Sequence, residues 1–228
     1  MRLDKYLANN TELSRKQVRV AIKKGRVELG NNLAEDPSTH ISPEICVNLD
    51  GEPVVEQGLG YFMMNKAEGW ICSHGKEQYP SVYECFDRPA DSLHVAGRLD
   101  VDTTGLLLVT GDGQWSHRIT SPAHHCPKVY RAWLAEFITE KMIFKLEKGV
   151  FLEAEGIRTK PAKVDKIDED EVLLTITEGK YHQVKRMMEA VGNSVARLHR
   201  EKIGELPLDE NLLPGEWREL SEEEVGLF

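Results

Sequence analysis

The sequence predicts an α+β protein of two domains, a small one over residues 1–57 and a larger one of mixed helices and strands over residues 61–228. Length is the first indication, because 228 residues suffice for a small domain followed by a medium one. Composition is the second, since 40% hydrophobic and 29% charged residues are typical of an ordinary globular chain. The third is the Gln-Gly-Leu-Gly run at 57–60, which predicts a short flexible joint between the domains.

Two short helices followed by short strands are predicted in the small domain. Leu3 and Leu7 are spaced i, i+4, which indicates a buried face on the first helix. Ser14 suits the N-cap of a second helix over about residues 15–24. Gly25 suits the position just after its last turn.

The second helix has an apolar face and a basic face. Val18 and Ile22 share the first, whereas Arg15, Arg19 and Lys23 recur every four residues on the second. Few acids on this helix are placed to pair with these bases, so RNA is the favoured partner of the basic face. A solvated helix without a ligand stays open as the alternative.

The charge of the chain is unevenly distributed. A net charge of −9 argues at first against a nucleic-acid partner, because Lys and Arg must neutralise phosphates. Residues 1–30, however, carry eight basic and three acidic side chains, a net charge of +5, while residues 31–60 hold six acids and no Lys or Arg. The eight bases are the candidate RNA-binding residues: Arg2, Lys5, Arg15, Lys16, Arg19, Lys23, Lys24 and Arg26.

Helices and strands follow one another irregularly in the larger domain. Short apolar or β-branched runs bounded by turn residues predict strands at 61–65, 106–110, 128–134, 162–167 and 172–177. Amphipathic runs that end at glycine predict helices at 140–148 and 181–190. The Gly-Asp-Gly run at 111–113 is a strong turn signal.

Several classes of protein are disfavoured by the sequence. No apolar run approaches the roughly 20 residues of a membrane span and no signal peptide is recognisable, so we expect a cytoplasmic protein without membrane contact. The four cysteines lack CxxC spacing, which indicates reduced thiols. The adjacent His124, His125 and Cys126 do not have the usual spacing of zinc ligands, so no metal site is expected.

The segment 94–110, HVAGRLDVDTTGLLLVT, is the strongest candidate for chemistry. It places two carboxylates and two threonines just before a buried strand, where catalytic groups often lie. Asp100 and Asp102 point to the same side of an extended stretch, so either can be the working carboxylate. A plain ion pair between Arg98 and Asp100 is the competing interpretation.

Several motifs carry a resemblance to known families. The runs RLDKYLA, SRKQVRVAIKKGRVELG and DPSTHISPEICVNLDGEPV resemble an S4-type RNA-binding domain. The runs GRLDVDTTGLLLVT, DGQWSHRITSP with HHCPKVY, and GKYHQVKRMMEAVGNSVARLHREKIG resemble the RsuA branch of the pseudouridine synthases. The resemblance implies a small S4-like (αL-type) domain followed by a mixed α/β synthase domain on a mainly antiparallel sheet.

The family pattern implies roles for three residues, and two further residues are candidates because they lie close to them in the sequence. Asp100 is the nucleophile in the motif register, and Lys185 is the cation that keeps it ionised, with Arg186 as the second candidate. Tyr130 packs against the flipped base, with a plain core aromatic as the alternative. Arg98 holds the nucleotide or its phosphate, or else supports the site structurally.

The implied reaction turns a uridine of ribosomal RNA into pseudouridine without cofactor or metal. The HHC run before Tyr130 and the run GKYHQVKRMMEAVGN are most similar to the small-subunit member of the branch, which modifies uridine 516 of 16S rRNA. The implied partner is ribosomal RNA, in a partly assembled small ribosomal subunit, with no obligate protein partner. A related large-subunit (23S) rRNA pseudouridine synthase and a non-catalytic rRNA-binding assembly factor stay open as alternatives.

Overall fold

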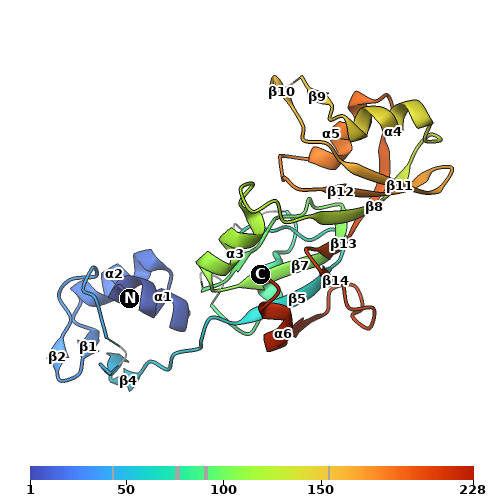
Figure 1. Cartoon of the computed structure of the whole chain (residues 1–228). Helices are drawn as coiled ribbons and strands as arrows, with labels where there is room; N and C mark the ends of the chain where they lie inside the picture. Colours follow the sequence, from blue (N-terminus) through green and yellow to red (C-terminus); the bar gives the residue numbers. More distant parts are fainter. Residues whose placement is uncertain (43, 75–77, 90–91, 154) are drawn as a thin grey trace.

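The computed structural model describes residues 1–42, 44–74, 78–89, 92–153 and 155–228. Figure 1 shows a small N-terminal unit of two helices and short strands, joined by a single stretch of chain to a larger unit around a twisted sheet. Within the described ranges, no helix has the length and apolar character needed to span a bilayer.

The small unit contains α1 (Leu3–Asn10) and α2 (Arg15–Lys23), which pack together beside a four-stranded sheet. The sheet has the order β2-β1-β3-β4, from β1 (Val27–Leu29), β2 (Asn32–Leu33), β3 (Val47–Leu49) and β4 (Glu52–Pro53). Ser14 forms a capping box with Gln17 at the start of α2. Leu7, Val18 and Ile22 are buried in the core of this unit, and the basic face of α2 is exposed.

The larger unit is built on a nine-stranded sheet with the order β11-β12-β8-β13-β7-β5-β15; β6 adds to β7 and β14 to β13. Its strands are β5 (Tyr61–Lys66), β6 (His94–Val95), β7 (Thr103–Thr110), β8 (Lys128–Leu134), β11 (Lys163–Asp168), β12 (Glu171–Ile176), β13 (Val195–Ile203), β14 (Leu206–Pro207) and β15 (Trp217–Glu219). Among the described strands of this sheet, β7 and β13 pair in parallel and the other neighbours are antiparallel. The predicted mainly antiparallel sheet is confirmed.

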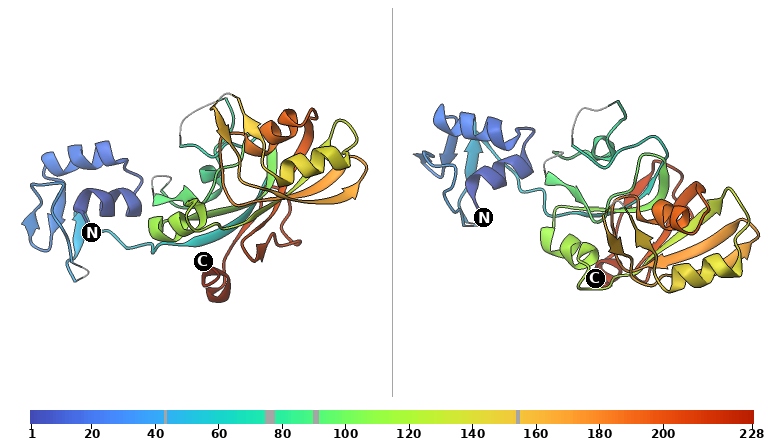
Figure 2. Two further views of the ribbon diagram at one scale, coloured as in Figure 1. Left: turned by 45° about the horizontal axis from the view of Figure 1, so that its top comes forward. Right: turned by 90° about the horizontal axis from the view of Figure 1, so that it is seen from above.

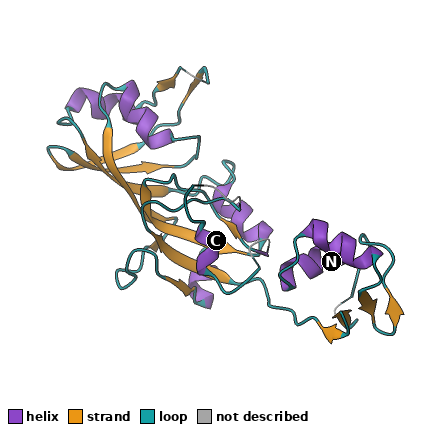
Figure 3. Ribbon diagram, turned by 180° about the vertical axis from the view of Figure 1, so that it is seen from behind, coloured by secondary structure: helices purple, strands orange, loops and turns teal. Residues whose placement is uncertain are grey.

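Helices lie at both ends of this sheet. Figures 2 and 3 show α4 (Glu140–Glu147) and α5 (Gln183–Ala190) together at one end, beside the hairpin of β9 (Phe151–Leu152) and β10 (Ile157–Arg158). Toward the other end lie α3 (Gly113–Thr120), the short 3₁₀ helix η1 (Val82–Cys85) and α6 (Glu222–Val225).

Two hydrophobic clusters lie on one face of the sheet. One packs α4 and α5 against β8, β11, β12 and β13, and the other packs η1 and the preceding loop against β5 and β7. Residues in register on neighbouring strands project from the same face, so Thr103 and Leu198 share this face, as do Gly105 and Arg200. Tyr130 contacts both clusters. Residues of β7, β13 and β8 line a cavity on this face, among them Thr103, Leu198 and Tyr130.

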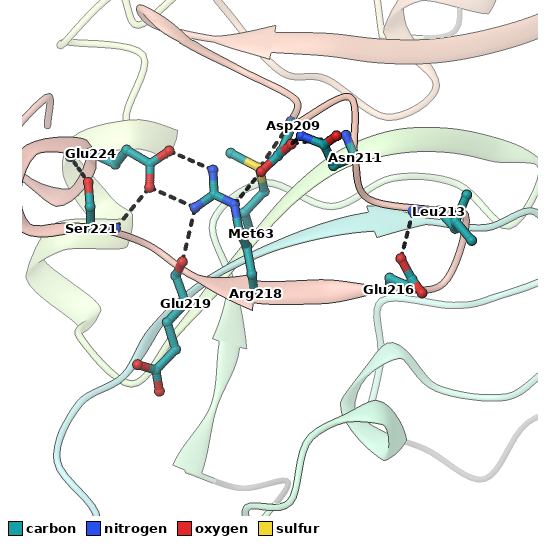
Figure 4. A network of polar contacts seen from close by, with 9 residues as sticks. All are labelled: Met63, Asp209, Asn211, Leu213, Glu216, Arg218, Glu219, Ser221 and Glu224. Carbon is teal, nitrogen blue, oxygen red and sulfur yellow. Dashed lines mark hydrogen bonds and ion pairs between the residues drawn. The ribbon is translucent and has the colours of Figure 1, made fainter.

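The C-terminal segment is fastened to the sheet by polar contacts around Arg218 (Figure 4). Arg218 of β15 donates from Nε to Asp209, at 2.6 Å, and from Nη2 to Glu224 of α6, at 2.7 Å. Ser221 caps α6 and completes a capping box with Glu224. The side chain of Met63, on β5, accepts from the backbone N–H of Asp209.

The structure differs from the sequence prediction at several elements. The long strand β13 and the helix α3 were not predicted. In β13 (VARLHREKI), residues 199–202 are four polar or charged side chains in a row, so the run shows neither the alternation nor the apolar character of a strand. Strand β7 begins at Thr103, earlier than predicted. Helix α5 begins at Gln183 and not at residue 181, because His182 before it has a left-handed φ of 48°.

Candidate active site

Asp100 lies in the loop between β6 and β7, and backbone hydrogen bonds hold that loop in place. The N–H of Thr103 donates to the Asp100 carbonyl at 3.1 Å, which makes a tight turn at the start of β7. The N–H of Gly69 donates to the Val101 carbonyl at 2.8 Å. The carboxylate is thereby presented at the end of a buried strand.

Lys66 anchors the same loop from inside the protein. It is fully buried, and its Nζ donates to the carbonyls of Ala67 (3.1 Å), Val101 (3.3 Å) and Thr103 (2.7 Å). A lysine ammonium has three protons to donate, so all are used. Burial lowers the pKa of Lys66 to about 8, against the opposing effect of nearby acidic groups such as Asp102. This lysine is a site residue that the motifs do not indicate, because nothing in the sequence signals a buried charge there.

Two carboxylates share one lysine at the site. Lys185 of α5 places Nζ 3.2 Å from Oδ2 of Asp100 and 2.6 Å from Oδ1 of Asp102. Nε2 of His182 lies 3.4 Å from the other oxygen of Asp100. These contacts bring the N-terminus of α5 to the loop, where the helix dipole favours negative charge. Both oxygens of Asp100 therefore have a partner from the α5 end.

The pKa shifts in this cluster follow from burial and charge. Burial raises the pKa of Asp102, but the hydrogen bond and charge of Lys185 outweigh it, so the pKa is held below its usual value. Burial lowers the pKa of Lys185, yet Asp102 and Asp100 raise it overall. Lys185 is accordingly charged at neutral pH.

A cavity of about 680 Å³ opens beside this cluster, within the roughly 300–1,000 Å³ common for small-ligand sites. It is lined by residues 97–103, by the β8 and β13 face of the sheet and by residues 176–185. Asp100, Tyr130 and Lys185 all line it, as the sequence-derived hypothesis requires. Arg98 also lines it, is exposed, and has no ion pair among the described residues.

Arg200 is a site residue that the sequence analysis missed. It lies on β13 with 2% of its surface exposed, and it donates to the carbonyls of Leu106 (2.8 Å) and Gly97 (3.0 Å). Its Nη1 also lies 3.3 Å from the hydroxyl of Tyr130, and its guanidinium carbon is 5.8 Å from the centre of that ring. Arg200 thus ties the start of the Asp100 loop to the aromatic wall of the cavity. Had β13 been recognised as a strand, an arginine on its buried face would have been a signal.

Arg186, the second sequence candidate for the cation beside Asp100, does not contact that carboxylate. Its guanidinium pairs with Glu155 and donates to the carbonyl of Tyr181 at 3.1 Å. Successive residues at the start of a helix point about 100° apart, so when Lys185 faces the loop, Arg186 faces the β9–β10 turn.

The eight candidate RNA-binding residues are exposed on the small unit. Arg2 and Arg19 pair with the buried Asp4, and Arg26 pairs with Asp50. The other five have no ion pair within the described part of the chain: Lys5, Arg15, Lys16, Lys23 and Lys24. These five are the bases most available to phosphate.

Neither disulfide nor metal-site geometry occurs in the parts of the chain that the structure describes. All four cysteines are free, and no group of three or more His, Cys, Asp or Glu is arranged around a common point that could hold a metal ion. The cavity itself presents a carboxylate beside a paired lysine and an aromatic ring. Such a carboxylate can add to an electrophilic carbon of a base or sugar placed against the ring.

Comparison with known proteins gives matches along the whole chain. The family profile described as RNA pseudouridylate synthase matches residues 60–190, and the profile of the S4 domain matches residues 1–44. The chain is 48% identical to the ribosomal small subunit pseudouridine synthase A of Haemophilus influenzae, over 99% of this chain and 98% of that protein. It is also 48% identical to the protein of the same name from Escherichia coli K12, over 99% of each. A solved structure titled a pseudouridylate synthase is 47% identical over the full length of both chains, with a TM-score of 0.73.

Proposed function

The chain belongs to the RNA pseudouridylate synthase family, and on that premise we propose that it converts one uridine of small-subunit ribosomal RNA to pseudouridine in the cytoplasm. Relatives that are 48% identical along nearly the whole chain are named for the small subunit, which supports this choice over the large subunit. We propose uridine 516 of 16S rRNA as the target, in a partly assembled subunit. The S4 domain at residues 1–44 supports RNA binding by the basic N-terminal unit.

One observation carries the chemical part of the proposal: Asp100 faces the cavity with Lys185 and His182 on its two oxygens. The reaction breaks the bond between C1′ and N1 of uridine, turns the base, and joins C1′ to C5; C5 then loses its proton and N1 gains one, so that the product is an isomer of the substrate. Asp100 either adds to C1′, adds to C6 of the base, or takes the C2′ proton to give a glycal. Each route needs an ionised carboxylate beside a fixed base, and orientation of this kind can lower a barrier by several kcal/mol.

The other residues serve to bind and orient. Tyr130 stacks on the flipped base and replaces the stacking lost from the RNA, while Arg200 fixes its hydroxyl. Lys185 pairs with both carboxylates and offsets their negative charge during attack. Arg98, exposed at the cavity, pairs with a phosphate of the target strand.

Tritium release from 16S rRNA transcribed with uridine labelled at C5 tests the proposal. We expect Asp100→Asn to abolish release while RNA binding and the melting temperature stay near those of the wild type. Asp102→Asn is the matched control on the same loop, and we expect it to lose no more than about tenfold, since its side chain is 56% exposed.

Four results would change the proposal. Full tritium release by Asp100→Asn would show that Asp100 is not the nucleophile. If Asp102→Asn is inactive while Asp100→Asn is active, Asp102 is the nucleophile. The release assay is run with free rRNA and with partly assembled subunits. If tritium is released from 23S rRNA but not from 16S rRNA in both forms, the protein is the large-subunit synthase. Tight, salt-sensitive rRNA binding by a wild-type protein that never releases tritium favours a non-catalytic assembly factor.

A further inference from the structure

Thr103 has a buried hydroxyl for which the fold provides no partner. Its residue surface is 1% exposed, and its Oγ1 is the one buried side-chain polar atom, among the described residues, without a hydrogen bond. Buried hydroxyls are nearly always satisfied, so an exception at a cavity needs an explanation.

The position of Thr103 in the sheet directs its side chain toward the cavity. Thr103 is in register with Leu198 of the parallel strand β13, and both residues line the cavity together with Asp100. Side chains alternate along a strand, so Thr104 points to the opposite face. There the hydroxyl of Thr104 is satisfied, at 2.8 Å from Nδ1 of His199. Of the two adjacent threonines, the one on the cavity side is left unpaired.

Three cations that line or border this part of the cavity donate to groups other than the Thr103 hydroxyl. Lys66 donates to three carbonyls, one of which belongs to Thr103 itself. Lys128 donates to the carbonyls of Ile119 and Cys126. Arg200 donates to two carbonyls and to the hydroxyl of Tyr130. The Thr103 hydroxyl therefore keeps both its donor and its acceptor capacity for whatever enters.

We propose, resting on the proposed function, that Thr103 is a substrate-contacting residue whose Oγ1 hydrogen bonds to the polar edge of the flipped uracil. That edge offers two carbonyl oxygens and the N3–H, and a hydroxyl can donate to the former or accept from the latter. Thr103 follows the nucleophile by three residues and is joined to it by the turn hydrogen bond, so a bond to the uracil fixes the base relative to Asp100. Tyr130 holds the face of the ring and Thr103 holds its edge.

Thr103→Val keeps the shape and the β-branch of the side chain but removes the hydroxyl. If Thr103 contacts the uracil, this variant loses activity without losing stability. Because no bond inside the protein is lost, stability stays equal to that of the wild type or rises. Because the bond to the base is lost, kcat/KM falls about tenfold. Thr103→Ser retains the hydroxyl and recovers most of the activity.

Thr104→Val is the matched control on the opposite face of β7. It removes a hydrogen bond that exists within the protein, so we expect a lower melting temperature with kcat/KM near that of the wild type. Steady-state tritium release and thermal unfolding of the three variants measure both quantities. Wild-type kcat/KM in Thr103→Val overturns the proposal, and so does an equal loss in Thr103→Val and Thr103→Ser.

Binding of uridine 5′-monophosphate, followed by NMR titration, separates this inference from the proposed function. If wild-type protein releases no tritium from any rRNA but Thr103→Val weakens nucleotide binding severalfold, the contact stands and the proposed function fails. If the wild type is active and both its kcat/KM and its nucleotide affinity are unchanged in Thr103→Val, the contact fails and the proposed function stands.

Discussion

At the scale of single residues, one lysine offsets the negative charge of two carboxylates. Lys185 contacts Asp100 and Asp102 together, and its side chain is 20% exposed, so solvent screens these interactions only partly. Asp100 and Asp102 both line the cavity, and without the charge of Lys185 they lose the cation that they share. The repulsion between two negative charges on one loop is then no longer offset by that lysine.

Lys185→Gln is therefore expected to lower kcat about 10- to 100-fold, which corresponds to the loss of one hydrogen bond to a charged group. The pKa of Asp102 rises in this variant, because burial remains while the charge of Lys185 is gone. Single-turnover tritium release measures the rate, and carboxyl-carbon NMR follows Asp102. Lys185→Arg keeps the charge and should restore part of the rate; a Lys185→Gln enzyme with wild-type kcat contradicts the role.

At the scale of elements, the active-site loop is held by two strands and a helix that are distant from one another in the sequence. Lys66 ends β5, Arg200 lies on β13 and Lys185 lies near the start of α5, yet all contact the loop around Asp100. The parallel pairing of β7 with β13 makes this possible, and it depends on Gly105. A Cβ at Gly105 would lie 2.3 Å from the carbonyl oxygen of Arg200.

The contacts of Arg218 fasten another element, the short helix α6, and they give a pH-dependent prediction. Arg218 holds the pKa of Glu224 below its usual value, and the N–H of Asn211 together with Arg218 does the same for Asp209. Stability from carboxyl groups with lowered pKa values is present above their unfolded pKa of about 4 and is lost as the pH falls through the lower folded values.

We expect Arg218→Gln to lower the melting temperature by about 2–4 °C at pH 7. The difference from the wild type should shrink below about pH 4, as both carboxyl groups become protonated in either protein. Thermal unfolding of both proteins at pH 7 and at pH 3 measures this difference in melting temperature. Arg26→Gln, which breaks the pair with Asp50 in the small unit, is a control for the loss of an exposed ion pair. An Arg218→Gln deficit that is the same at both pH values contradicts the assignment.

At the scale of the whole molecule, a chain with net charge −9 has its basic residues gathered at one end. The connecting stretch is hydrogen bonded at both of its ends. The N–H of Gln57 donates to Asn10 in the small unit, and the carbonyl of Leu59 accepts from Gly111 in the large one. The joint predicted from its glycines therefore has fixed contacts on either side.

RNA binding should depend on the α2 bases that have no acidic partner. We expect the double variant Lys16→Gln, Lys23→Gln to bind 16S rRNA more weakly and to reduce the slope of log K against log salt by roughly one to two. Filter binding between 50 and 200 mM salt measures the slope. The control is the double variant Lys141→Gln, Lys145→Gln on the exposed side of α4, which removes the same amount of positive charge. It should leave the slope unchanged. An equal loss of RNA affinity in both double variants would mean that net charge, and not the α2 face, controls binding.

The sequence by itself determined the features that depend on neighbouring residues. The i, i+4 spacing and Ser14 cap fixed α1 and α2, the β-branched and apolar runs located β5, β8, β11 and β12, and the order of the motifs indicated the family. It also singled out Asp100, Tyr130 and Lys185, because each lies in a motif that can be recognised without coordinates.

Only the tertiary structure decided which groups meet. It placed Lys185 rather than Arg186 beside Asp100, gave Arg200 and Lys66 their carbonyl partners, and left Thr103 unpaired at the cavity. A local pattern cannot show these facts, because burial and hydrogen bonding of a charged or hydroxyl side chain depend on which distant strand lies beside it. The sequence supplies the side chains of the site, and the pairing of β7 with β13 decides which other residues surround them.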